Sequence, residues 1–201
     1  MNVDFIKERL GEDLYSVYVK GTYVMGEMTE ESDVDLVVIF RENSREVFSE
    51  LKGHKKFGNI SISGFSLEEL RTGVKKGKGS SPKNFMRMVE YYQLLHGQDV
   101  SKKDFPRQSK KESYDLLKEF IKQEMLPNYK IKYGFSDLVK ACLWLEFNYL
   151  ALSKDVNYSY KYISNNTDKE LVKKAYNYKF EKPSEEEKEL FIEEFKKMLI
   201  S

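Results

Sequence analysis

The sequence predicts an α+β protein, in which a small β-sheet domain is followed by an all-helical bundle domain. In the first half of the chain, short apolar runs with strand character alternate with segments of helical periodicity. Beyond residue 100 the strand signals stop and helical periodicity dominates. The composition changes at 101–109 (SKKDFPRQS), the best linker candidate, so we expect domains at 1–100 and 101–201.

The first half follows a β-α-β-α-β-α order. The run at 34–40 is apolar throughout, which indicates a strand buried on both faces. Two helix starts have the pattern of a capping box, Asn43 with Glu46 and Ser66 with Glu69. We expect strands at 14–20, 34–40 and 57–64, and helices at 2–10, 21–28, 43–53, from 66, and from Pro82 to His96 with Gly97 as its stop.

The second half reads as helices only. Capping-box patterns mark three of the starts, Ser109/Glu112, Thr167/Glu170 and Ser184/Glu187. The only cysteine, Cys142, lies in an apolar helical run and is expected to be a buried small hydrophobe. The expected helices are 110–126, 135–154, 157–164, 167–178 and 184–200, and the aromatic residues expected in their core are Trp144, Phe147, Tyr149, Tyr158, Tyr160 and Tyr162.

Composition limits the classes of partner. The 34 basic and 33 acidic residues give a net charge of +1, which argues against a large nucleic-acid surface. No apolar stretch is long enough for a transmembrane helix, and the acidic N-terminal segment has no signal-peptide pattern. A single cysteine suits a reducing compartment. We therefore expect a cytoplasmic protein with no membrane partner.

Two carboxylates lie close together at the start of the second predicted strand, on Asp33 and Asp35. Alternate side chains of a strand share a face, so the two would lie about 7 Å apart along the chain. They repel each other unless a cation lies between them. Mg²⁺ suits this arrangement, because it takes one or two carboxylates and keeps its other positions for water and phosphates. Gly21-Thr22 ends the preceding strand, where a glycine turn would offer backbone N–H groups to a phosphate.

A sequence signature runs from Gly21-Thr22 through ten intervening residues to Asp33-x-Asp35. It resembles the signature of the polymerase-β-type nucleotidyltransferases, in the branch that holds the minimal and aminoglycoside nucleotidyltransferases. The family's usual form has serine after the glycine, and Thr22 keeps the hydroxyl. The segment 32–36 (SDVDL) matches the second half of the signature closely. The resemblance implies a small mixed sheet that carries the motif and a helical C-terminal domain that helps to enclose ATP and acceptor.

The resemblance also implies an activity and a set of roles. The activity is Mg²⁺-dependent transfer of a nucleoside monophosphate, expected to be AMP from ATP rather than another nucleotide, to a hydroxyl of a small-molecule acceptor. Asp33 and Asp35 would be the catalytic metal ligands. A lysine in the helical domain of related enzymes reaches the nucleotide, and Lys161 occupies that region here. The nucleotide-binding residues would be Gly21 and Thr22 at the phosphates, Ser32 through local hydrogen bonds in the loop, and Lys161.

The sequence departs from the family at the third strand. The family places a third carboxylate there, but residues 59–63 read NISIS, with Asn59 or Ser61 at the expected position. Three alternatives remain: a glutamate from elsewhere replaces this acid, the acceptor needs no base, or the protein binds nucleotide with little transfer. The candidate glutamates are Glu68, Glu69 and Glu90. His54 and His96 are expected at the surface or as helix caps.

The remaining alternatives concern the partner of the enzyme and the role of one loop. An antitoxin-type protein adenylyltransferase, which adds AMP to a partner's tyrosine, has a similar motif, but 201 residues with a sizeable helical domain is long for that role. A nucleic-acid polymerase or tRNA-end-adding enzyme fits the charge balance poorly.

The segment 75–81 (KKGKGSS) is either a solvated loop or a loop that closes over nucleotide phosphates.

Overall fold

The structure is a computed structural model that describes residues 3–29, 32–53, 59–76 and 80–200. The chain divides into two compact units, Met1–Gln108 and Ser109–Ser201. Most of the segment expected as a linker therefore belongs to the first unit. The backbone N–H of Gln108 donates to the carbonyl oxygen of Lys83 at 3.0 Å, and the Arg107 guanidinium donates to the carbonyl oxygen of Met86 at 2.5 Å.

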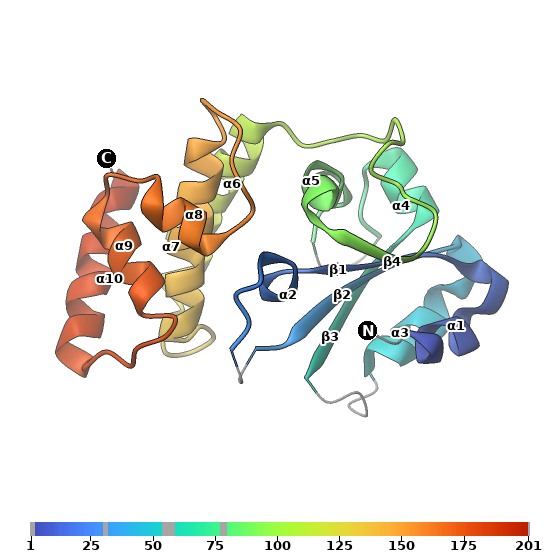
Figure 1. Ribbon diagram of the computed structural model, residues 1–201, viewed down its shortest axis with the longest axis horizontal. Coiled ribbons are helices and arrows are strands. Elements are labelled where there is room, and N and C mark those ends of the chain that lie inside the picture. Colours follow the sequence, from blue (N-terminus) through green and yellow to red (C-terminus); the bar gives the residue numbers. More distant parts are fainter. Residues whose placement is uncertain (1–2, 30–31, 54–58, 77–79, 201) are drawn as a thin grey trace. The chain divides into compact units, whose positions relative to one another are not determined.

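The first unit is built on a four-stranded mixed sheet (Figure 1). The strands lie in the order β3-β2-β1-β4. The pair β2 and β3 is parallel, whereas β1 is antiparallel to both β2 and β4. The expected mixed sheet and the α+β class are thus confirmed. The strands are β1 (Leu14–Lys20), β2 (Val34–Phe40), β3 (Ile60–Ser66) and β4 (Gln93–Gly97).

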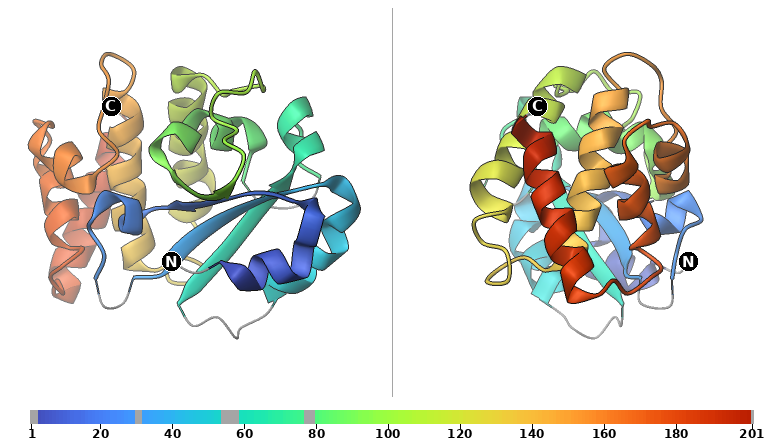
Figure 2. Two further views of the ribbon diagram at one scale, coloured as in Figure 1. Left: turned by 45° about the vertical axis from the view of Figure 1, so that its right-hand side comes forward. Right: turned by 90° about the vertical axis from the view of Figure 1, so that its left-hand side faces the viewer.

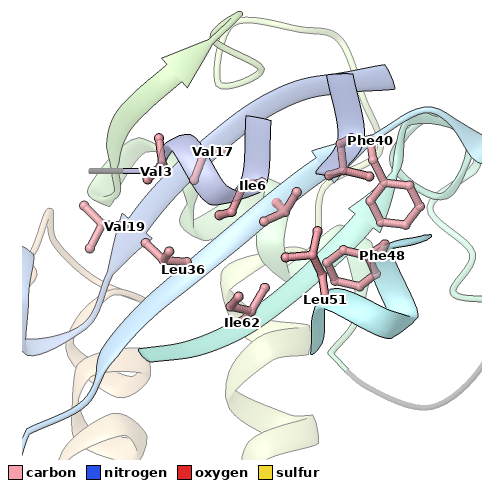
Figure 3. Close-up of a cluster of buried hydrophobic side chains, with 11 residues drawn as sticks. Val3, Ile6, Val17, Val19, Leu36, Phe40, Phe48, Leu51 and Ile62 are labelled. Atoms are coloured by element: carbon pink, nitrogen blue, oxygen red, sulfur yellow. The ribbon is translucent and has the colours of Figure 1, made fainter. Parts of the chain in front are cut away.

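Helices cover both faces of this sheet (Figure 1). One face, here called the α1–α3 face, packs against α1 (Asp4–Leu10) and α3 (Arg45–Gly53). The opposite α4–α5 face packs against α4 (Leu67–Thr72) and α5 (Pro82–Met88). A single turn of helix, α2 (Thr22–Met25), follows β1. The buried side chains of the α1–α3 face include Val3, Ile6, Val17, Val19, Leu36, Phe40, Phe48, Leu51 and Ile62 (Figure 3).

The alternation along β2 separates the two faces. Leu36 and Val38 point into the core of the α1–α3 face, and Val37 and Ile39 point into that of the α4–α5 face. Residues 36–40 are all buried, as the continuous apolar run predicts for a strand covered on both sides. The face of any residue near the start of β2 can therefore be assigned by counting from these positions.

The helix expected from Pro82 to His96 is wrong in its second half. Helix α5 ends at Met88, a 3₁₀ turn covers Val89–Tyr91, and Gln93–Gly97 form β4 on the open edge of β1. Tyr92 and Leu95, assigned to one helical stripe, pack on opposite faces of the sheet. The apolar spacing alone could not reveal this, because the backbone groups of β1 need a partner strand that is distant in sequence.

Of the two capping boxes expected in the first unit, the structure contains one. The capping box at Ser66 and Glu69 is confirmed, with reciprocal hydrogen bonds of 3.2 and 2.9 Å. The one at Asn43 is wrong: its side-chain amide donates to the Asp13 carboxylate at 3.2 Å, and α3 begins at Arg45 after a 3₁₀ turn. Strand β3 continues to Ser66, two residues beyond the expected end at 64.

The second unit contains only helices as regular elements among its described residues, as expected (Figure 2). Helix α7 is its centre, since it packs against the other four α-helices and buries ten of its residues. None of the described helices combines the length and apolar character needed to cross a bilayer. The elements are α6 (Lys110–Phe120), a π-helical turn (Ile121–Met125), α7 (Phe135–Leu150), α8 (Tyr160–Asn165), α9 (Glu170–Asn177) and α10 (Glu185–Ile200).

The helix starts and core of this unit follow the sequence with exceptions. Ser109 caps α6, and Ser184 and Glu187 bond reciprocally at the start of α10. The Thr167 box is wrong, because its hydroxyl donates to the buried Glu146 carboxylate at 2.7 Å and α9 starts at Glu170. Cys142 is fully buried, which confirms its expected role. Of the expected core aromatics, Tyr149 is exposed, Trp144 and Tyr162 are half-buried, and Phe147, Tyr158 and Tyr160 are buried.

Candidate active site

Gly21 occupies a position that no other residue fits. It follows the last residue of β1 with a φ of +74°, in the left-handed region that side chains disfavour. A Cβ placed on it would lie 3.0 Å from Oδ2 of Asp35. The backbone of the glycine turn and the carboxylate therefore touch, and the two halves of the sequence motif meet in space.

Asp35 stands in a row of three side chains across the sheet. Its residue pairs with Lys20 at the end of β1 and with Ser61 near the start of β3. Residues paired across neighbouring strands point to the same face. Counting from Val37 and Ile39 places this row on the α4–α5 face, with Lys20 on one side of Asp35 and Ser61 on the other.

Asp33 directly precedes β2 and is exposed. The chain beside it is already held along β3, since the N–H of Val34 donates to the carbonyl oxygen of Asn59 at 2.7 Å. Val34 packs on the α1–α3 face. By alternation we expect Asp33 on the face of Asp35.

Ser32 closes the turn that leads into the two aspartates. Its hydroxyl accepts the N–H of Thr29 at 2.9 Å and lies 2.9 Å from the Thr29 hydroxyl. Its own N–H donates to the carbonyl oxygen of Thr29 at 3.0 Å. These are local hydrogen bonds of the kind expected for Ser32, and they fix the chain just before Asp33.

Tyr92 is a neighbour of the site that the sequence did not single out. It packs on the α4–α5 face directly before β4. Burial raises the pKa of its phenol, Arg87 opposes that rise, and the charge of Asp35 adds to it. Tyr92 therefore lies within the electrostatic field of Asp35. Lys20 was also missed, because only the register of β1 against β2 brings it beside Asp35.

Residues 3–128 of the chain match the model of a known protein family, the nucleotidyltransferase domain. This is more than half of the chain and includes the whole motif. The chain belongs to the nucleotidyltransferase domain family. It is therefore an enzyme, a nucleotidyltransferase, and the resemblance to the polymerase-β-type group is confirmed. No curated protein matches the chain.

A solved structure is similar over nearly the whole length of this nucleotidyltransferase. It is the spectinomycin adenyltransferase AAD(9) from Enterococcus faecialis, crystallised with ATP and spectinomycin. The TM-score is 0.62 and the sequence identity 15%, with 98% of this chain and 96% of that chain covered. At this identity the likeness shows the fold alone.

The donor set of this nucleotidyltransferase fits a magnesium ion with few protein ligands. Within the described ranges, no three or more His, Cys, Asp or Glu side chains are grouped to hold a metal. Two neighbouring carboxylates, Asp33 and Asp35, are nevertheless what Mg²⁺ commonly takes from a protein. Ser61, one of the two residues expected where the family places its further acid, is exposed and pairs with Asp35 across the sheet.

Two of the three candidate substitutes for that acid lie at the wrong end of the sheet. Glu68 and Glu69 are on α4, which starts after the far end of β3, about 16 Å along the strand from Ser61. Glu69 is also fully buried and accepts the N–H of Lys76 at 2.7 Å. Glu90 is the remaining one, exposed in the 3₁₀ turn just before Tyr92.

Lys75 and Lys76, the described lysines of the 75–81 segment, are also remote from Asp35. The Lys75 ammonium donates to the carbonyl oxygen of Gly64 at 3.0 Å and lies 3.3 Å from the Glu69 carboxylate. They border a cavity of about 150 Å³ near the end of β3. Residues 77–79 lie outside the described ranges, so the two interpretations of this loop stay open for them. The cavity is lined by Phe40, Arg45, Phe48, Ser49, Ser63, Gly64, Phe65, Lys75, Lys76 and Ser80.

The other residues singled out in the sequence are the two histidines, Thr22 and Lys161. His96 lies on β4 opposite Val17 and is not a helix cap, while His54 falls outside the described residues. Thr22 is half-buried at the first position of α2. Lys161 is exposed on α8 of the second unit, between Tyr160 and Tyr162, and its role towards a nucleotide stays a prediction.

Proposed function

We propose that the protein is a Mg²⁺-dependent nucleotidyltransferase that transfers AMP from ATP to a hydroxyl group of a small-molecule acceptor. The contact between the Asp35 carboxylate and the backbone of Gly21 carries this proposal. It joins an acid suited to Mg²⁺ to a glycine turn suited to phosphates. The adenyltransferase with the similar fold was crystallised with ATP and spectinomycin, which supports ATP and a small acceptor. A cytoplasmic location, which the single cysteine suits, is part of the proposal.

Each residue of the motif has a separate task in this proposal. Asp33 and Asp35 would hold Mg²⁺, which when bound supplies neutralising charge for the phosphates. The turn at Gly21 and Thr22 would bind the β- and γ-phosphates through backbone N–H groups, because the first N–H groups of a helix have no intrahelical partner. The hydrogen-bonded turn at Ser32 would hold the two aspartates in place. Lys161, on α8, would contact the nucleotide.

The base for the acceptor hydroxyl is Glu90 in this proposal. Of Glu68, Glu69 and Glu90, it alone lies within two residues of Tyr92, whose phenol feels the charge of Asp35. A carboxylate near the acceptor would accept the proton that the hydroxyl loses as its oxygen attacks the α-phosphate. Pyrophosphate then leaves towards the N–H groups of the Gly21 turn.

Transfer of label from ATP tests the proposal directly. We expect wild-type protein with Mg²⁺ and α-labelled ATP to label at least one acceptor in a panel of aminoglycosides and aminocyclitols. Asp35→Asn should abolish the label, whereas Asp104→Asn, an exposed aspartate of the same unit, should keep it. The proposal fails if wild type labels nothing in the panel, or if Asp35→Asn labels as well as wild type. GTP, CTP and UTP in parallel identify the nucleotide.

A second candidate is a nucleotide-binding protein with little transfer activity. Ser61 favours it, since a hydroxyl stands beside Asp35 and cannot accept a proton near neutral pH. Calorimetry that shows binding of Mg·ATP, together with no release of pyrophosphate in the presence of any acceptor, would select this candidate over the transferase.

A further inference from the structure

We infer that Lys20 couples the binding of metal and nucleotide: it weakens the affinity of the empty site for a divalent cation and strengthens its affinity for the Mg·nucleotide complex. This inference rests on the proposed function, because it concerns the same site. It assigns a nucleotide-binding role to a residue outside the sequence motif.

The register of the sheet places Lys20 beside the metal-binding acid. Lys20 is the antiparallel partner of Asp35, and paired residues have Cβ atoms about 5 Å apart on one face. Tyr18, two residues earlier on β1, packs on the α4–α5 face, so Lys20 belongs to that face as well. Lysine and aspartate therefore share one side of the sheet.

Lys20 also adjoins the turn assigned to the phosphates. It is the residue directly before Gly21, whose backbone touches the Asp35 carboxylate. A ligand that contacts both Gly21 and a metal on Asp35 therefore lies next to the base of the Lys20 side chain. Among the described residues no ion pair engages the Lys20 ammonium, which leaves it available to such a ligand.

The sign of the effect follows from the charges. A divalent cation on Asp33 and Asp35 is repelled by a neighbouring ammonium group, and this repulsion lowers the affinity for metal alone. A triphosphate brings several negative charges and reverses the balance, because the ammonium attracts the phosphates. Linkage makes the coupling mutual, so nucleotide raises the affinity for metal as metal raises that for nucleotide.

The test compares Lys20→Met with wild type in two binding measurements. Electron paramagnetic resonance follows the binding of Mn²⁺ alone, and calorimetry follows a non-hydrolysable ATP analogue with Mg²⁺. We expect Lys20→Met to bind Mn²⁺ alone about tenfold more tightly and the Mg·nucleotide about tenfold more weakly. Lys20→Arg, which keeps the charge, should stay near wild type in both.

A matched control removes the same charge elsewhere in the unit. Lys7 lies on α1, which packs on the opposite α1–α3 face, and its ammonium is 3.1 Å from Asp4. Lys7→Met should therefore change neither affinity. Circular dichroism of each variant establishes that the fold is retained, and Lys20→Gln, which also removes the charge, replaces Lys20→Met if that variant fails to fold.

The outcomes separate the inference from the proposed function. A wild-type protein that binds no Mg·nucleotide overturns the proposed function, and the role of Lys20 with it. If wild type binds the nucleotide but Lys20→Met changes neither affinity, or lowers both, only the inference is overturned. Opposite changes in the two affinities are the result that a merely structural lysine would not give.

Discussion

The Asp35 carboxylate lies against the backbone of Gly21, so close that a Cβ on the glycine would come within 3.0 Å of Oδ2. The two residues are joined by a segment that leaves the sheet through α2 and returns at β2. The pairing of β1 with β2 brings its two ends together. A metal-binding acid and a phosphate-binding turn thereby become parts of one site.

Gly21→Ala should abolish transfer through this contact. The backbone of Gly21, with φ +74° and ψ −151°, is one that essentially only glycine adopts, so an alanine there costs about 1–3 kcal/mol. Its methyl group would also displace the Asp35 carboxylate. Gly26→Ala is the matched control, because Gly26 has a φ of +69° and no atom lies within 4 Å of the place that a Cβ would take. Both variants should lose free energy of unfolding in urea titrations, Gly21→Ala more than Gly26→Ala, because Gly26 has the αL conformation (ψ +25°) that other residues can adopt. Only Gly21→Ala should lose metal binding. Equal loss of metal binding in both would contradict the importance of the contact.

Ser61→Asp should give the site a third carboxylate. Because residue 61 pairs with Asp35, the new acid would face the same metal position and should tighten Mn²⁺ binding about tenfold. Without metal, repulsion between the two acids should destabilise the fold by about 0.5 kcal/mol. Ser61→Asn, which is similar in size but uncharged, should show neither effect. Equal Mn²⁺ affinity of the two variants would mean that residue 61 does not face the metal.

The motif and most of the elements could be predicted from sequence because they depend on local patterns. Strands β1 and β2 were expected at their observed bounds, and the Gly21 turn and the two aspartates came from one short signature. The row of Lys20, Asp35 and Ser61 could not be predicted in full, since it depends on strand register between distant segments.

The errors have the same physical origin. Residues 93–97 carry apolar residues that suit a helix, but the open edge of β1 requires backbone partners and draws them into β4. Thr167 has the spacing of a helix cap, yet the buried Glu146 carboxylate takes its hydroxyl. In each case a partner far away in sequence outweighed a correct local preference.

Glu90→Gln should lower the turnover number about 100-fold if Glu90 is the base. The affinity for Mg·nucleotide should stay near that of wild type, because Glu90 is assigned to the acceptor hydroxyl and not to the phosphates. Steady-state kinetics and calorimetry measure the two quantities. Glu8→Gln, an exposed glutamate on α1, is the control. Unchanged turnover in Glu90→Gln would leave an acceptor that reacts without a base.

Glu69→Gln should destabilise the first unit by about 3 kcal/mol, since it removes one charge from a buried ionic network. The Glu69 carboxylate lies 3.3 Å from the Lys75 ammonium and 3.4 Å from the Arg45 guanidinium, and it accepts the backbone N–H of Ser66 at 2.9 Å. Urea unfolding at pH 7 measures the loss. Glu68→Gln, half-buried on the same helix, should cost far less.

The pH dependence of this loss has a definite sign. Burial acts to raise the pKa of Glu69, but hydrogen bonds from the backbone N–H groups of Ser66 and Lys76 and the charges of Lys75 and Arg45 outweigh it and lower the pKa. A lowered pKa stabilises the fold above the unfolded-state value of about 4.3, and this contribution is lost as pH falls through the folded-state value. The difference in free energy of unfolding between wild type and Glu69→Gln should therefore shrink as the pH of the measurement falls from 5 to 3. A difference that stays constant over that range would show that the charge of Glu69 contributes nothing to stability.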